Sequence, residues 1–443
     1  MESLLGALVL VLLGLLGARL SFRTTRAPLG PRLFLSTGTH FLFLGILLGS
    51  HGLGLLSREI IGQLQPFLAL GLGWIGLLFG LQLDRRHLAP FPRRYLGIAF
   101  GQAAVVFGLF FTVAAPLLDA TDALAPGTRG ALLATAATAS ISTPAGIALI
   151  SHTFLVRGRV SQLLFFISSL DGVIGVLALQ LAYARYHPLA LSTGTGLGVG
   201  AWLALSLALG LVSGIFFLWF TRPKPGREEL MLFLLGIVVF TAGIGLYLGL
   251  SPLFLSMMTG AVVANLSPLR RRVYAALQAW EQPIYVILLV LAGALFEFPS
   301  WLVLPLAAGY VVIRIFGKLA GAAIVTRVLP VGFHVPADLG IGLVAQGGIS
   351  LAMAISIALT YGSIGAASGG GVAALFAAIV LGVVVNELVG PFLTRNLLRR
   401  AGEIEPRIES ALAAGELRGD DEGPPAPGPT GLPRASRSRR GTS

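Results

Sequence analysis

Residues 160–184 read VSQLLFFISSLDGVIGVLALQLAYA, an apolar run that contains one charged side chain, Asp171. A helix needs about 20 mostly apolar residues to cross the hydrocarbon core of a bilayer, where charge is expensive. The stretch therefore predicts a membrane-spanning helix with a carboxyl group near its middle. Similar runs recur along the chain, and together they give thirteen candidate spans, at residues 4–22, 34–55, 62–83, 95–118, 130–153, 160–184, 196–220, 229–250, 252–268, 282–296, 301–326, 339–360 and 370–393.

The composition also indicates an all-α polytopic membrane protein. Of the 443 residues, 55% are hydrophobic and 11% are charged, whereas roughly 25% are charged in a typical soluble protein. The mean hydropathy of +0.87 leaves too few polar side chains to cover the surface of soluble domains. The chain has no cysteine, which excludes disulfide bonds, thiolate metal sites and cysteine catalysis.

The basic residues occur in short groups between the spans and do not form one basic domain. Loops after odd-numbered spans carry sixteen Lys and Arg side chains, whereas loops after even-numbered spans carry three. Because positively charged loops stay in the cytoplasm, this asymmetry predicts an external N-terminus, a cytoplasmic C-terminus and a location in the cell membrane. The net charge of +12 therefore reflects topology, and no nucleic-acid partner is expected.

The composition changes at about residue 401. Acidic residues come first, followed by a stretch rich in Pro and Gly and then by four arginines. This segment has too little apolar content to form a core. We expect a transmembrane domain over residues 1–400 and a disordered cytoplasmic tail over residues 401–443.

Two short patterns occur twice, which indicates an internal repeat. The matching stretches are Leu42–Leu44 with Gly49 and Leu253–Leu255 with Gly260, and Phe79–Asp84 and Ala292–Glu297. The offsets of 211 and 213 residues both correspond to seven spans. Because seven is odd, the two halves would be inverted relative to each other, which is typical of transporters with a binding site near the bilayer midplane.

Four charged side chains lie away from the ends of the predicted spans: Asp171, Arg314, Lys318 and, less deeply, Glu387. The charged form of a carboxyl group is disfavoured at membrane depth, so Asp171 can hold either a proton or a small cation, as an antiporter requires. The alternative is a structural pair with a buried Arg or Lys. Arg314 and Lys318 share a helix face, and we expect an ion pair between Arg314 and Asp171. We expect Lys318 to reach the cytoplasmic interface and Glu387 to lie near the end of the last span.

Two spans contain helix-breaking residues near their centres, in the stretches ASISTPAG at 139–146 and AQGGIS at 345–350. A proline removes a helical hydrogen bond, and paired breaks in two repeats expose carbonyl groups and helix ends to a ligand. The residues expected to break the helices are Pro144, Gly146, Gly347 and Gly348. The residues expected to offer neutral oxygens to a partly dehydrated monovalent cation are Ser142, Thr143 and Gln346.

Four motifs in this order resemble those of the monovalent cation/proton antiporters, which include sodium/proton exchangers and the transmembrane parts of potassium efflux systems. The motifs are Leu77–Asp84, Leu170–Gly172, Ile313–Arg314 and Gln346–Gly348. The resemblance covers about residues 1–400. It implies a homodimer with a scaffold and a mobile core, in which two crossed, discontinuous helices flank the aspartate.

The chain departs from the pattern of that family at three positions. Leu170 replaces the first residue of an Asp-Asp or Asn-Asp pair, Thr143 replaces the Asp of an Asp-Pro motif, and Gln346 replaces an Arg. With one deep carboxyl group, the simplest stoichiometry is one proton for one cation, so electroneutral exchange is expected.

We therefore predict a secondary antiporter that exchanges Na⁺ or K⁺ for H⁺ at Asp171, with Arg314 and Lys318 as coupling residues. No cofactor and no catalytic constellation is expected. Two alternatives remain at this point. One is a channel-like cation pathway on the same fold, in which cation flux is not tied to protons. The other is a transport-inactive membrane module that interacts through its tail.

Overall fold

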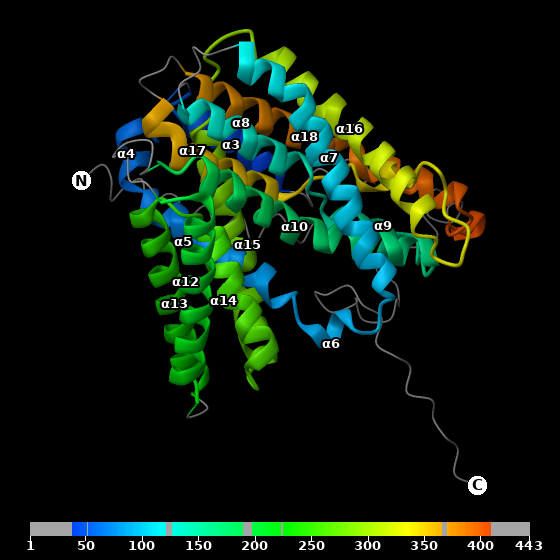
Figure 1. The fold of residues 1–443 in the computed structure, drawn as a ribbon, viewed down its shortest axis with the longest axis horizontal. Coiled ribbons are helices and arrows are strands. Elements are labelled where there is room, and N and C mark those ends of the chain that lie inside the picture. Colours follow the sequence, from blue (N-terminus) through cyan, green and yellow to red (C-terminus); the bar gives the residue numbers. More distant parts are fainter. Residues whose placement is uncertain are drawn as a thin grey trace.

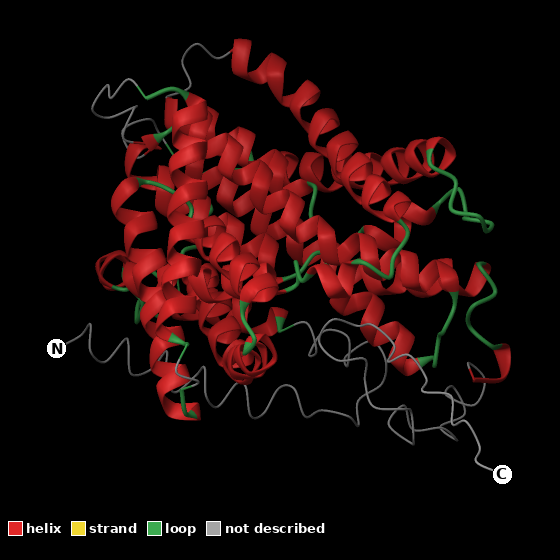
Figure 2. Ribbon diagram, turned by 60° about the horizontal axis from the view of Figure 1, so that its bottom comes forward, coloured by secondary structure: helices red, strands yellow, loops and turns green. Residues whose placement is uncertain are grey.

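The computed structural model describes residues 38–50, 52–120, 126–188, 197–222, 225–365 and 370–408. In these parts of the chain, helices joined by short loops account for the fold (Figure 2). In chain order the elements are α3 (Thr39–Leu48), α4 (Arg58–Gln63), α5 (Gln65–Leu81), α6 (Arg85–Leu88), α7 (Arg93–Ala120), α8 (Pro126–Ala139), α9 (Pro144–Thr153), α10 (Arg159–Arg185), α12 (Val199–Phe220), α13 (Arg227–Leu248), α14 (Pro252–Leu266), α15 (Arg270–Ala294), α16 (Val303–Val328), the 3₁₀-helix η2 (Leu339–Leu343), α17 (Gly348–Gly365) and α18 (Gly371–Arg400).

The all-helical membrane architecture predicted from the sequence is confirmed. Each predicted span from 34–55 onward corresponds to a helix or to two helices separated by a break. Within the described residues, eight helices are long and apolar enough to cross a membrane, and four shorter apolar helices accompany them. The first predicted span, residues 4–22, lies outside the described residues, so the count of thirteen stays a prediction.

Local sequence sets several helix boundaries. α14 begins at Pro252, whose fixed φ suits the first helical turn, and Ser251 Oγ accepts a hydrogen bond from Phe254 N (3.3 Å). α13 ends at Leu248 and is capped by Gly249, whose φ of 64° is a left-handed conformation that glycine adopts without a steric penalty. These caps fix the sharp turn between α13 and α14.

Contacts between the helices divide them into two groups, whose elements are labelled in Figure 1. The first group contains α3, α5 and α12–α15, and in it α12, α13 and α14 lie side by side and extend from one end of the molecule. The second group contains α7–α10 and α16–α18, with α16 packed against α7 and α18. Because both interrupted spans belong to the second group, that group holds the candidate site.

The contacts among four helices of the first group have the symmetry that the predicted repeat implies. The repeat relates α3 to α14 and α5 to α15, and the observed contacts join α3 to α15 and α5 to α14. Exchange of the two halves therefore converts one contact into the other. Glycines permit both close approaches, because a Cβ on Gly45 or Gly293, or on Gly80 or Gly260, would overlap backbone atoms of the opposite helix.

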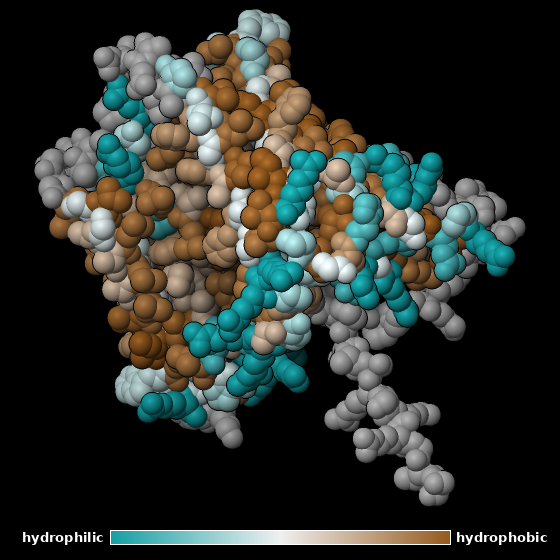
Figure 3. All heavy atoms as spheres, turned by 45° about the vertical axis from the view of Figure 1, so that its right-hand side comes forward, coloured by the Kyte–Doolittle hydropathy of each residue, from teal (hydrophilic) through white to brown (hydrophobic). Residues whose placement is uncertain are grey.

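The surface agrees with a location in the bilayer. Hydrophobic side chains cover much of the face shown in Figure 3, and hydrophilic side chains gather along one side of it. On α12 and α13, large apolar side chains such as Phe216, Trp219 and Phe240 are exposed. An apolar surface of this kind is stable only against lipid or another apolar partner.

Candidate functional site

Each of the two interrupted spans loses its helical structure near its centre. In the first, α8 ends at Ala139 and α9 begins at Pro144. In the second, η2 ends at Leu343 and α17 begins at Gly348. Gly146 was also expected at a break, but it lies inside α9. A proline at the first helical position explains where α9 begins, because its missing N–H would have no helical partner there.

The two breaks contact each other. Thr143 N donates a hydrogen bond to Ala345 O (3.0 Å), and Ser142 Oγ donates to Leu343 O (2.8 Å). Gly347 permits this approach, since a Cβ there would lie 2.8 Å from Thr143 Oγ1. Thr143 also caps α9 through its side-chain oxygen. The breaks therefore form one unit in which backbone groups of one span bind the other.

Arg314, on α16, binds carbonyl groups that the breaks leave without helical partners. Its Nη1 donates to Ala139 O (2.8 Å), and its Nη2 donates to Val344 O (3.0 Å) and Leu343 O (3.3 Å). Helix C-termini carry partial negative charge, so a guanidinium group between two of them stabilises both. The expected ion pair between Arg314 and Asp171 is therefore not formed. The guanidinium group donates its hydrogen bonds to backbone carbonyl groups instead.

Asp171, on α10, forms its ion pair with Lys318 instead. Lys318 Nζ lies 2.7 Å from Asp171 Oδ2, and neither side chain has exposed surface. The same ammonium group donates to Ser140 O (2.6 Å) in the first break. The prediction that Lys318 extends to the interface is wrong, because a carboxylate and an unpaired carbonyl group lie within its reach inside the protein.

Gln102, on α7, completes this cluster and was not predicted from the sequence. With its amide oriented to suit its neighbours, it donates to Asp171 Oδ1 (3.2 Å) and accepts from Lys318 Nζ (2.8 Å). The side chain is fully buried. An isolated amide in the apolar run 95–118 is the signal that could have identified it, because a polar group at membrane depth needs a partner.

Gln346, an expected cation ligand, belongs to a separate hydrogen-bond network beside the second break. Its Nε2 donates to Thr138 O (3.0 Å) and Tyr310 Oη (2.9 Å), and its Oε1 accepts from Asn386 Nδ2 (2.9 Å). The amide thereby connects the breaks to α8, α16 and α18. Its oxygen could also contact a cation, but only beside the Asn386 amide.

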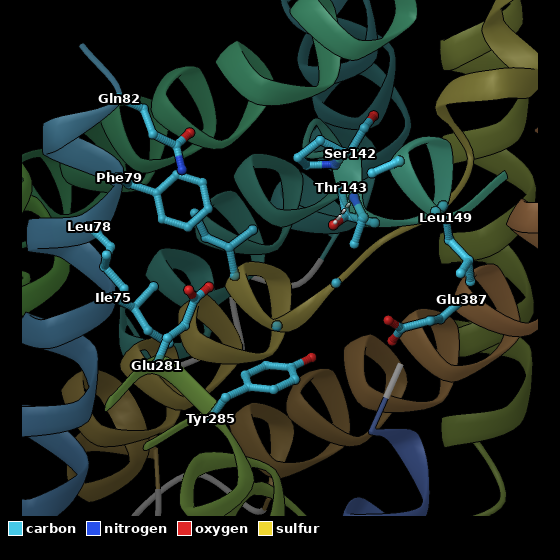
Figure 4. A pocket seen from close by; sticks show the side chains of 18 of the residues that line it. Ile75, Leu78, Phe79, Gln82, Ser142, Thr143, Leu149, Glu281, Tyr285 and Glu387 are labelled. Atoms are coloured by element: carbon cyan, nitrogen blue, oxygen red, sulfur yellow. Dashed lines mark hydrogen bonds between the residues drawn. The ribbon is translucent and has the colours of Figure 1, made fainter. Parts of the chain in front are cut away.

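A cavity of about 460 Å³ lies next to the breaks (Figure 4). Helices α5 and α15 form one wall, and α9, α17 and α18 form the other, with the breaks. The predicted residues Ser142, Thr143, Pro144, Gly347 and Gly348 all line it. The cavity therefore lies between the two helix groups and brings the residues of both breaks into contact with the same space.

Asp171 does not line this cavity. Phe79 and Ile349 do, and both pack against Gly172, the residue after Asp171. A Cβ on Gly172 would lie 2.7 Å from Cε1 of Phe79 and 3.2 Å from Cδ1 of Ile349. These apolar side chains therefore cover the part of α10 next to Asp171 on its cavity side, whereas Ser142 borders both the cavity and Asp171.

Glu387 also lines the cavity, contrary to the expectation that it lies near the end of the last span. α18 continues to Arg400, beyond the predicted end at residue 393, so Glu387 lies in the middle of the helix. Its side chain is 7% exposed. Figure 4 shows its carboxylate directed into the cavity, with Glu281 and Tyr285 of α15 on the opposite side.

Comparisons with known proteins agree with this architecture. The family described as sodium/hydrogen exchanger, transmembrane, matches residues 8–361. Among solved structures, the chain is similar to the sodium proton antiporter MjNhaP1 from Methanocaldococcus jannaschii at pH 8, with a TM-score of 0.63 and 14% sequence identity, over 89% of this chain and 97% of that chain. No curated protein matches the sequence. The structural likeness establishes a shared antiporter fold, and because the family match extends over most of the sequence, the chain belongs to the sodium/hydrogen exchanger family.

Proposed function

We propose that the protein exchanges Na⁺ or K⁺ for H⁺ and that Asp171 is the shared cation and proton site. The observation that carries this proposal is the buried ion pair between Asp171 and Lys318 beside two helix breaks. Membership in the sodium/hydrogen exchanger family supports cation/proton exchange as the reaction. A buried carboxylate must keep a counter-charge or a proton, so it can exchange one for the other but cannot remain bare.

The hydrogen bonds of Lys318 support a site for a cation. Its ammonium group donates hydrogen bonds to both Asp171 Oδ2 and Ser140 O. When the ammonium group moves away, these two oxygens lose their donor together. The Ser142 hydroxyl lies beside the Asp171 carboxyl group and adds a neutral oxygen. We propose that Thr143 and Gln346 contribute further oxygens as the breaks rearrange.

Arg314 has a different role in this proposal. It holds the carbonyl groups of Ala139, Leu343 and Val344 on both breaks. We propose that it positions the breaks around Asp171, whereas Lys318 couples the site to the proton.

A single carboxyl group gives a simple charge balance. If Lys318 keeps its proton, Asp171 carries either a proton or a cation, and the site has the same net charge in both forms. If Lys318 releases its proton when the cation binds, the ion pair and the cation-loaded site are both neutral. Each scheme moves one proton against one monovalent cation, so we propose electroneutral exchange.

Cation-induced proton movement in proteoliposomes tests the proposal. Wild-type protein and Asp171→Asn are compared with Na⁺, K⁺ and Li⁺, with and without a clamped membrane potential. We expect proton movement that the substitution abolishes and that the potential does not change. Glu228→Gln, an exposed carboxylate at the start of α13, is the matched control.

The other outcomes separate the alternatives. Cation flux without proton movement would show a channel-like pathway. Proton movement that survives Asp171→Asn would place the exchange site elsewhere. The absence of any flux, together with a partner bound through residues 401–443, would indicate a transport-inactive module.

We also propose that the protein works as a homodimer in the cell membrane, with its N-terminus outside and its C-terminus in the cytoplasm. The asymmetric distribution of basic loops supports this orientation. The oligomeric state can be measured by native mass spectrometry from lipid nanodiscs. A protein that is monomeric there at all concentrations would contradict the dimer.

A further inference from the structure

The cavity between the two helix groups has an unbalanced charge. Two acidic residues line it, Glu281 from α15 and Glu387 from α18. Among the described residues that line it, none is Lys, Arg or His. A cavity that gathers carboxylates of one sign between low-dielectric walls concentrates cations. The charge of the lining therefore favours a cationic occupant.

The carboxyl group of Glu387 is buried in the wall of the cavity. Its side chain is 7% exposed, and within the described residues no hydrogen bond or ion pair reaches its carboxylate. Figure 4 shows the carboxylate directed into the cavity. A buried carboxylate in this position needs a proton or a counter-ion. The cavity provides the space for such an ion.

Packing fixes Glu387 relative to the breaks. Gly390, one turn further along α18, lies so close to the second break that a Cβ on it would be 2.6 Å from Ala345 Cα. α18 therefore cannot rotate about its axis to carry Glu387 away from the cavity without a clash at the break. Thr143 and Tyr285 line the same cavity and carry hydroxyl groups that can act as neutral ligands.

We propose that this cavity is a second monovalent-cation site, with Glu387 as its charged ligand and Glu281 as the charge on the opposite wall. Glu387 is not part of the Asp171 cluster, but Ser142 borders both the cavity and Asp171, and Phe79 and Ile349 cover Gly172 beside Asp171. The role of the second site deepens the proposed function and rests on it: a cation waits at Glu387 until these apolar side chains move and admit it to Asp171.

Equilibrium binding of radioactive Na⁺ and Rb⁺ to the purified full-length protein in lipid nanodiscs tests the second site, with Rb⁺ as the probe for K⁺. Asp171→Asn removes the proposed transport site, so the binding that remains reports on the cavity. We expect Asp171→Asn to keep binding one of these ions. Adding Glu387→Gln should weaken that binding by about tenfold or more, as the loss of a charged ligand predicts. Glu281→Gln should have a smaller effect in the same direction.

Two controls keep the result interpretable. Glu387→Gln alone should retain binding at Asp171, which shows that the variant is folded, and Glu387→Asp should recover part of the binding at the cavity. Glu228→Gln in the Asp171→Asn background should change nothing, because Glu228 is exposed and outside the cavity.

Either of two results overturns the second site: no cation binding to folded Asp171→Asn, or binding that Glu387→Gln leaves unchanged. Failure of the transport proposal is a different result, namely proton exchange that survives Asp171→Asn. In that case loss of binding on adding Glu387→Gln would still establish the cavity as a cation site.

Discussion

Lys318 Nζ lies 2.7 Å from Asp171 Oδ2, and both side chains are completely buried. The two residues belong to different helices, α16 and α10, so their ion pair also joins these helices. Two buried charges of opposite sign tolerate each other, but each is strongly unfavourable alone. The folded state therefore depends on both partners together more than on either one.

The first prediction concerns this dependence. Lys318→Met and Asp171→Asn should each lower the free energy of unfolding by about 3–5 kcal/mol, because each leaves an uncompensated buried charge. The double variant should be more stable than Lys318→Met, since neither charge remains. Thermal unfolding of the three variants in one detergent measures the coupling. Additive losses would contradict a direct interaction.

The second prediction concerns Arg314 and the breaks. Arg314→Lys keeps the positive charge but removes the forked geometry that binds Ala139 O and Val344 O together. Each lost hydrogen bond to a charged group is worth about 1.5–3 kcal/mol. Arg314→Lys should therefore lower both melting temperature and exchange rate, and Arg314→Met should lower them further. Arg222→Lys, at an exposed position after α12, is the control. If Arg314→Lys behaved like that control, the guanidinium would not hold the breaks.

The breaks were predictable because their cause is local. Pro144 and the glycine pair at 347 and 348 disfavour a continuous helix whatever surrounds them. The partner of Asp171 was not predictable in this way. Arg314 and Lys318 are one turn apart on the same face, so the sequence shows two candidate cations at nearly equal depth. Which of the two forms the ion pair with Asp171 depends on how α16 packs against α10, and the local sequence does not determine that packing.

Glu387 and Gln102 differ from the sequence predictions for related reasons. The apolar run ends at about residue 393, but α18 continues to Arg400, so Glu387 lies near its middle. Hydropathy locates the lipid-facing part of a helix and not its ends, because polar residues can continue a helix inside a protein. Gln102 is not predicted because one neutral amide changes a hydropathy profile very little.

The third prediction concerns the segment that follows α18. Glu403 accepts hydrogen bonds from Val160 N (2.6 Å) and Ser161 N (2.9 Å) at the start of α10, the helix that carries Asp171. A carboxylate there satisfies free N–H groups and complements the helix dipole. Glu403→Ala should lower the free energy of unfolding by about 0.5–2 kcal/mol. Thermal unfolding of this variant against Glu405→Ala, an exposed neighbour, tests the cap, and equal effects would argue against it.

The fourth prediction concerns His187, between α10 and α12. Its ring stacks on Trp202 at 3.4 Å, and burial lowers its pKa from 6.5 to about 4. The folded state therefore favours the neutral ring. The contribution of the neutral His187 ring to the free energy of unfolding is fully present above about pH 6.5. It is lost as the pH falls toward about 4. His187→Gln should reduce the loss of melting temperature across that window, whereas His334→Gln, at an exposed position, should not. An identical acid dependence with and without His187 would show that this ring does not titrate there.

The fifth prediction uses the absence of cysteine to locate the mouth of the cavity. Gln82 lines the cavity at the end of α5, and Arg85 and Arg86 come after it, beyond Leu83 and Asp84. Because basic loops mark the cytoplasmic side, the cavity should open toward the cytoplasm. A single cysteine at Gln82→Cys should therefore react with a membrane-impermeant thiol reagent in inside-out vesicles and not in intact cells.

Two control positions make this labelling decisive. Tyr247, 85% exposed at the far end of α13, should react as Tyr247→Cys only from outside the cell. Ala352, 1% exposed inside α17, should not react as Ala352→Cys from either side. Excess Na⁺ or K⁺ should slow labelling at Gln82→Cys if a cation occupies the cavity, and this protection should disappear when Glu387→Gln is added. Reaction of Gln82→Cys from outside would instead place the cavity on the external side and invert the topology derived from the basic loops.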